Sequence, residues 1–175
     1  QTLLFNSLET VSHNLNRKNL NLKLFEFGNV YFAAPEKGIY KEEKRLGLIM
    51  TGESNEEHWK QKSSSVDFYN LKGIVNSIIS KLGIDNPGTK TNESHLAFFD
   101  FGLSLEIVKK QVVSFGQLKT QILTHFDIKQ TVFYAEFNWD NVLELLVMNK
   151  IKYSQLPKFP SIRRDLALLV DEALN

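Results

Sequence analysis

The chain has 175 residues, 42% of them hydrophobic and 23% charged, which suits one globular domain or one domain plus a fragment. The 21 basic and 20 acidic residues give a net charge of +1, which argues against a domain that functions mainly in binding nucleic acid. The absence of cysteine excludes disulfides, thiolate zinc sites and cysteine nucleophiles, and it fits a cytoplasmic location. No apolar run is long enough to span a membrane.

The first 51 residues predict a helix followed by two strands. A single apolar stripe runs along a helix over residues 2–18 and consists of Leu4, Leu8, Val11 and Leu15. Aromatic and branched residues over 22–32 predict a strand, with Gly28 as a bulge or a point of close packing. Residues 33–44 contain a proline and a glycine and predict a loop. A second strand over 45–51 then completes an antiparallel hairpin with a long tip.

A second amphipathic helix is predicted after a polar stretch over 52–64. Ser65 is expected to cap it, and Gly83 to end it. Its apolar face consists of Phe68, Leu71, Val75, Ile78 and Leu82. A polar turn is predicted over 86–94.

The remaining chain predicts mostly strands with short helices between them. The predicted elements are strands over 95–101, 104–109 and 111–115, a short helix marked by Leu118, Ile122 and Phe126, a strand over 131–137, a helix over 139–148 that opens near Asn138, and a strand over 166–170. These elements predict an α+β fold, an antiparallel β-sheet flanked by helices. The plausible domain boundary lies in the proline-containing linker over 152–160.

Three stretches carry a resemblance to a known family. They are NSLETVSHNLNRKN…KLFEFGNVYF over 6–32, DFYNLKGIVNSIISKLGI over 67–84, and 115–146 followed by KFPSIRRDLALLVD over 158–171. In this order they resemble the β subunit of bacterial-type phenylalanyl-tRNA synthetase. The terminal pattern Phe-Pro-x-x-x-Arg-Asp-Leu-Ala is the most specific of them.

The resemblance implies a class II aminoacyl-tRNA synthetase-like core over 1–151, a linker over 152–160, and the truncated start of a ferredoxin-fold anticodon-binding domain over 161–175. It implies an α2β2 assembly in the cytoplasm, in which the α chain attaches phenylalanine to tRNA with ATP and magnesium. The β core is then a catalytically degenerate copy beside the active one. We expect the chain to be a piece of that longer subunit.

The positions of the arginines indicate whether this core could still bind and activate ATP. A class II ligase needs fixed cations for the ATP phosphates, and arginine suits this because its guanidinium binds phosphate in two places. In the class II ligases the first such arginine follows the first hairpin strand, where residues 29–34 of this chain contain no arginine. The second opens the helix after the strand 131–137, and no arginine occurs anywhere over 46–162. We therefore expect no catalytic residue and no cofactor site in this chain.

Competing interpretations remain open. The main alternative is an active class II-type ligase core in its own right, and a third is a free-standing RNA-binding module. The aromatic residues Phe133, Tyr134 and Phe137 are expected to fill the space that adenine would need. Arg45 opens the second hairpin strand, where active relatives can place a substrate-contacting basic residue. Its other interpretation is a solvated charge at a strand end beside Glu42 and Glu43.

Metal and nucleophile sites find little support. The histidines His13, His58, His95 and His125 fall on separate elements, and no ligand spacing accompanies them, so no metal site is predicted. The serine run 63–65 lacks the glycines of a nucleophile elbow.

Two sets of residues are candidates for partner contacts. The stripe Leu4, Leu8, Val11 and Leu15, together with the hairpin, is the candidate interface with the α subunit. The basic residues Lys158, Arg163 and Arg164 are candidates for tRNA contact in the full-length subunit. The alternative for them is an exposed linker in which Arg164 pairs with Asp165 or Asp171.

Overall fold

The computed structural model describes residues 1–34, 39–55, 59, 62–84, 88–148 and 164–165. Its elements are α1 (Leu4–Leu15), β1 (Leu22–Ala34), β2 (Ile39–Thr51), α2 (Phe68–Lys81), β3 (Lys90–Glu93), β4 (Phe99–Ile107), β5 (Lys110–Leu118), α3 (Thr120–His125), β6 (Val132–Asn138) and α4 (Trp139–Met148). The predicted linker, the predicted strand over 166–170 and most of 161–175 lie outside the described residues. None of the described helices is long and apolar enough to cross a membrane.

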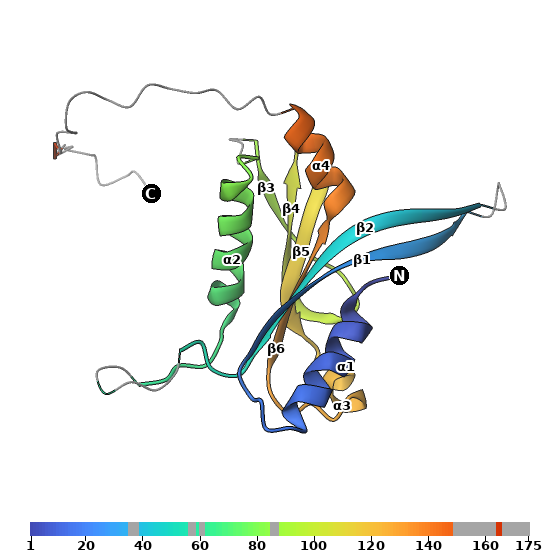
Figure 1. Cartoon of the computed structure of the whole chain (residues 1–175). Coiled ribbons are helices and arrows are strands. Elements are labelled where there is room, and N and C mark those ends of the chain that lie inside the picture. The colour runs from blue at the N-terminus through green and yellow to red at the C-terminus, as the bar shows by residue number, and fades with distance from the viewer. Residues whose placement is uncertain (35–38, 56–58, 60–61, 85–87, 149–163, 166–175) are drawn as a thin grey trace, which may run out of the picture.

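The six strands of the described residues form one antiparallel sheet in the order β1-β2-β6-β5-β4-β3. Strands β1 and β2 pair without interruption from Leu22↔Thr51 to Ala34↔Ile39. The far half of this hairpin extends as an arm beyond the rest of the sheet (Figure 1). Strand β6 pairs with β2 on one side and β5 on the other, so the last strand lies beside the hairpin. The sheet and its helices confirm the predicted α+β fold.

The alternation of side chains along each strand produces two apolar clusters, one on each face of the sheet. Leu46, Leu48, Phe133 and other strand residues pack with α2 and α4 on one face. Residues such as Ile49 pack with α1 and α3 on the opposite face. Figure 1 shows α1 and α3 together at one end of the sheet. The same face carries polar residues farther along β2 and β6.

Local backbone and side-chain contacts determine where α2 begins and ends. Asp67 caps the helix, because its Oδ1 accepts from the Asn70 N–H at 2.8 Å and its own N–H donates to Asn70 Oδ1 at 2.9 Å. The prediction that Ser65 caps it was wrong by two residues, since Ser65 instead forms a β-bridge with Glu53. Gly83 has φ +65° just after the helix, so its predicted role as terminator is confirmed.

The hairpin is longer than predicted. Residues 33–34 and 39–44 belong to its strands instead of to a loop. Lys41 and Glu42 show no apolar alternation because this arm extends past the helices that bury the rest of the sheet. Its backbone hydrogen bonds hold the pairing without help from a core.

The strands over 95–115 were predicted as three short pieces, and the structure forms two longer strands, β4 and β5. They meet in a two-residue turn in which Val108 and Lys109 have φ of 50° and 60°. Two positive φ values in succession match the twist of a tight hairpin. Lys109 was expected inside a strand, and β3 was expected to be a turn.

The apolar stripe of α1 forms part of this chain's own core. Leu4, Leu8 and Val11 are fully buried, and Leu15 packs against the same cluster. Their side chains are therefore not open to a partner, and only the outer side of α1, with the exposed Phe5, offers a contact surface. The predicted interface role of this stripe was wrong in this respect, because the sheet already covers it.

Gly28 is a point of close packing and not a bulge, since the register of β1 and β2 is unbroken there. A Cβ atom at this position would lie 2.7 Å from Leu3 Cδ2. The residue before α1 therefore packs directly onto the β1 backbone.

Substitution of Gly116 tests the close contact between β5 and β4. A Cβ there would lie 2.3 Å from the Phe101 carbonyl oxygen, a backbone atom that cannot rotate away. We expect Gly116→Ala to lower the free energy of unfolding by about 3 kcal/mol, measured by urea denaturation. The matched control is Gly73→Ala in α2, which meets no atom within 4 Å. It should raise the free energy by about 0.5–1 kcal/mol, and equal stability of both variants would contradict the packing.

Candidate functional site

A cavity of ≈ 300 Å³ opens on the sheet face that carries α1, beside the start of that helix. Its charged lining residues are Arg45 from β2 and Glu136 from β6, and Asn138 lies directly across from Arg45 in the sheet. Apolar side chains, among them Leu96 and Phe98, complete the lining. The cavity therefore combines one cation, one carboxylate, amide groups and an apolar wall.

The Glu136 carboxylate is the centre of the hydrogen bonding in this cavity. Its Oε2 accepts from the Thr2 hydroxyl at 2.5 Å, the Leu3 backbone N–H at 3.0 Å and the Tyr134 hydroxyl at 2.6 Å. Thr2 Oγ1 in turn accepts from the Leu4 N–H at 3.2 Å. Only 11% of the Glu136 side chain is exposed, so these donors replace the water that the carboxylate loses. The residues before α1 are thereby fixed to β6.

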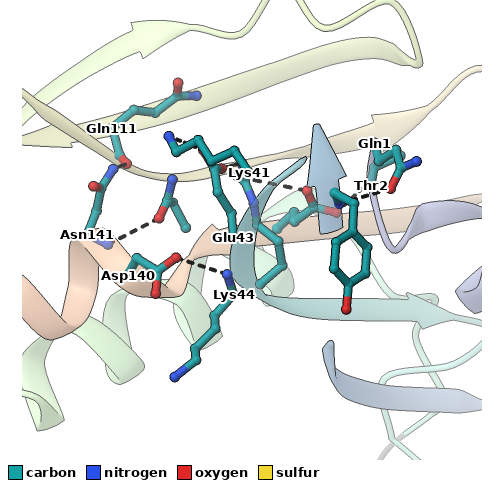
Figure 2. A network of polar contacts seen from close by, with 12 residues as sticks. Gln1, Thr2, Lys41, Glu43, Lys44, Gln111, Asp140 and Asn141 are labelled. Carbon is teal, nitrogen blue, oxygen red and sulfur yellow. Dashed lines mark hydrogen bonds and ion pairs between the residues drawn. The ribbon is translucent and has the colours of Figure 1, made fainter. Parts of the chain in front are cut away.

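Arg45 is paired by carboxylates of its own chain. Its guanidinium donates to Glu43, and its Nη1 lies 4.0 Å from Glu136 Oε1. Lys41 also donates to Glu43, at 2.7 Å (Figure 2). Only 19% of the Arg45 side chain is exposed, so its interpretation as a solvated strand-end charge was wrong, although the expected neighbour Glu43 is its partner. Its two terminal nitrogens face the carboxylates of Glu43 and Glu136, whereas its buried Nε has no hydrogen-bond partner among the described residues.

Two pKa shifts follow from these contacts. The hydrogen bond from Lys41, with Arg45 nearby, lowers the pKa of Glu43, so this carboxylate stays ionised beside the guanidinium. Burial raises the pKa of Tyr134 well above its usual range, and the Glu136 carboxylate adds to the effect. Tyr134 therefore stays protonated and donates to Glu136.

The start of α4 supplies amides at the position where the resemblance implies that an active core would carry an arginine. Asn138 Oδ1 accepts from the Asn141 N–H at 3.1 Å and so caps the helix near the predicted position. Asn141 Nδ2 donates to the Gln111 carbonyl at 2.8 Å, and Asp140 accepts from the Lys44 N–H at 2.9 Å (Figure 2). These bonds join α4 to β5 and β2. Residues 138–141, at the start of the helix, contain no arginine.

The aromatic residues of β6 do not fill the cavity as predicted. Phe133 and Phe137 face α2 and α4 on the opposite side of the sheet, and Tyr134 alone faces α1. The alternation of side chains along a strand separates them. Glu136 was not singled out from the sequence, although a lone carboxylate within the apolar run 132–137 was a signal for it.

The other predicted site residues are scattered or fall outside the described residues. Lys158, Arg163 and His58 lie outside them, and Arg164 is exposed. Ser63 donates to Glu53 at 3.0 Å, so it serves the loop before α2. Within the described ranges, no three histidine or acidic side chains gather where they could hold a metal ion.

Comparison with solved structures gives the class. The structure of pyrrolysyl-tRNA synthetase from Desulfitobacterium hafniense matches with a TM-score of 0.58 over 82% of this chain and 48% of that chain, at 11% identity. A second structure of the same synthetase matches equally well at 15% identity. The chain therefore has the fold of a class II aminoacyl-tRNA synthetase.

Sequence comparison gives the family within this class. The family model described as "Phenylalanyl tRNA synthetase beta chain CLM domain" matches residues 1–139. The phenylalanine–tRNA ligase β subunits of Bacteroides thetaiotaomicron and Staphylococcus aureus are 38% and 35% identical, each over 98% of this chain. The chain belongs to the phenylalanyl-tRNA synthetase β-chain family, and it spans 22% and 21% of the length of these relatives.

Removal of the Tyr134 hydroxyl tests the buried network. We expect Tyr134→Phe to lower the free energy of unfolding by about 1–2 kcal/mol at neutral pH, because the carboxylate loses a donor. Above about pH 10 the unfolded tyrosine loses its proton while the folded one keeps it, so wild-type stability falls as pH rises.

The Tyr134→Phe variant has no hydroxyl at this position and so does not lose this stability. The difference in free energy of unfolding between the wild type and the variant should therefore narrow between about pH 7 and pH 11, as measured by urea denaturation. Tyr69→Phe, at an exposed position, is the control, and the difference in free energy of unfolding between it and the wild type should not change with pH. A gap for Tyr134→Phe that stays constant with pH would contradict the buried hydrogen bond.

Proposed function

We propose that this chain is the non-catalytic, structural core of a phenylalanine–tRNA ligase β subunit. In this role it supports the ligation of phenylalanine to its tRNA, and a catalytic α chain that uses ATP and magnesium performs the reaction. Family membership supports the ligase assignment. The observation that supports the non-catalytic role is the pairing of Arg45 with Glu43 and Glu136.

The charge of the site argues against nucleotide binding. A triphosphate needs preorganised cations where its charge develops. Here Glu43 already holds the guanidinium, and the nearby Glu136 carboxylate would repel phosphate oxygens. Asn138 stands at the start of α4 in place of a second cation. The cavity therefore lacks the electrostatics of ATP activation.

Pyrophosphate exchange tests this role. We expect the complete β subunit alone to show no phenylalanine-dependent ATP–pyrophosphate exchange above background, and the addition of the α chain to produce it. The α chain with an unrelated protein in place of the β subunit is the control. Exchange by the β subunit alone would favour the alternative, an active ligase core.

An aromatic surface on the hairpin is our candidate for contact with the α chain. β1 is an edge strand of the sheet, and its Phe25, Phe27 and Tyr31 are exposed. They alternate along the strand and so share one face. The Phe27 ring lies 4.9 Å from that of Trp139 in α4, which joins this surface to the helix. An exposed apolar surface beside an open strand edge is typical of a protein interface.

A charge placed on this surface should weaken the assembly. We expect Phe25→Glu to raise the dissociation constant of the complete β subunit and the α chain at least about tenfold, because it buries a carboxylate without a partner. Sedimentation of the mixed subunits measures this. Tyr69→Glu makes the same change at an equally exposed aromatic of α2 and is the control. Equal weakening by both variants, or by neither, would remove the hairpin as the contact surface.

Contact with tRNA is proposed only for the complete subunit. Arg163 and Arg164 fall in the segment 161–175 assigned by resemblance to the anticodon-binding domain, and Lys158 falls in the linker before it. The net charge of +1 argues against independent RNA binding by this chain.

A further inference from the structure

We propose that the cavity beside Arg45 and Glu136 binds a small neutral molecule that carries a carboxamide group and an apolar group. This binding site goes beyond the structural role proposed above and does not depend on it. Three features of the cavity support a ligand of this kind, namely the balance of its charges, the N–H donors at its edge and its apolar wall.

The first feature is that the charges of the cavity balance. Among the described residues, its charged lining side chains are Arg45 and Glu136, whose Nη1 and Oε1 atoms lie 4.0 Å apart. Arg45 also pairs with Glu43, and Lys41 pairs with the same carboxylate at 2.7 Å. Two positive and two negative side chains therefore offset one another. A charged ligand would lose hydration and find no excess of the opposite charge, so the cavity favours a neutral molecule.

The second feature is a buried donor that has no acceptor. The two terminal nitrogens of Arg45 face carboxylates, but its Nε is buried and has no hydrogen-bond partner among the described residues. A buried N–H group in this state is uncommon, because it has lost water and gained no bond in return. An oxygen atom of a ligand would satisfy it. The guanidinium must turn slightly to present Nε, and at 4.0 Å no hydrogen bond to Glu136 opposes that turn.

Asn138 supplies a second donor beside Arg45. The two residues lie directly across from each other in the register of β2 and β6, and both line the cavity. Asn138 Oδ1 accepts from the Asn141 N–H, which identifies the other atom of the amide as the nitrogen. This Nδ2 donates no hydrogen bond within the described part of the chain. Because a carbonyl oxygen has two lone pairs, one ligand oxygen can accept from both residues.

An acceptor for the ligand lines the same cavity. Asn141 Nδ2 donates to the Gln111 carbonyl, so the remaining atom of that amide is Oδ1. Over the residues that the structure describes, Oδ1 accepts no hydrogen bond. A carboxamide carries an oxygen and an NH₂ group and remains neutral, so it matches both kinds of partner. A ketone or an ester offers the oxygen alone.

The third feature is the wall formed by Leu96, Phe98 and Val112, which determines the rest of the ligand. These side chains can pack against a ring or a branched chain. The cavity volume of ≈ 300 Å³ is at the small end of ligand sites, which suits one such group and one carboxamide.

Phenylacetamide, phenylacetate and phenethylamine form a matched set of probes, because they share a ring and a two-carbon chain and differ in charge. We expect the complete β subunit, without the α chain, to bind phenylacetamide saturably with a dissociation constant of about 1 mM, measured by titration calorimetry and by shifts of methyl NMR signals. Both charged probes should bind at least about tenfold more weakly. A charged probe that binds as tightly as the amide, or no saturable binding of the amide, would overturn the proposal.

Arg45→Lys tests the donor. Lysine keeps a positive charge beside Glu43 and Glu136 but has no Nε–H group. We expect this variant to bind phenylacetamide at least about fivefold more weakly, because the ligand oxygen loses a donor. Arg17→Lys makes the same change at an exposed position outside the cavity and should leave the affinity unchanged. Wild-type affinity in Arg45→Lys would overturn the proposal.

Glu43→Gln tests the balance of charge by a gain of binding, which a misfolded protein would not show. Glu43 is not among the lining residues, so the change removes a negative charge from beside Arg45 without altering the wall. Phenylacetate should then bind several-fold more tightly than it binds to the wild type. Unchanged affinity for phenylacetate would overturn the proposed charge balance.

The outcomes for this site and for the structural role are separate. Failure of amide binding would leave the pyrophosphate exchange experiment above unaffected. Conversely, exchange by the β subunit alone would overturn the structural role and not this site.

Discussion

The buried carboxylate of Glu136 connects parts of the chain that are far apart in sequence. It lies on β6 beside β2, and a carboxylate in that position is stable only with donors around it. Thr2, Leu3 and Tyr134 supply them, so the segment that leads into α1 is held on the sheet. The same carboxylate faces Arg45 and so helps to set the charge of the cavity.

The cavity shows that a fold of the synthetase class can contain a hollow in which the charged side chains pair within the chain. The hairpin, β6 and the helix that follows it are present, and a hollow remains between β2 and the start of α1. In the structural role proposed above, the groups that line it do not suit ATP activation, because the guanidinium is paired and α4 begins with an amide. Function depends on such groups, and the fold alone does not imply it.

The two faces of the hairpin differ in their surroundings. On the face toward α1, Gly28 and Gly47 let Leu3 approach the backbone closely. On the other face, Phe25 and Phe27 stay exposed beside α4. One face of the hairpin is thus packed within the chain, and the other face stays exposed.

The sequence by itself determined the α+β class, the family resemblance, the bounds of α4 at 139–148 and the absence of arginine over 46–162, because these depend on local periodicity and on residue identity. Only the tertiary structure decided the length of the hairpin, whose polar arm has no apolar pattern to reveal it. It also decided which face Phe133 and Tyr134 occupy and brought Thr2 to Glu136 across 134 positions. These contacts depend on the order of strands in the sheet, which local sequence does not encode.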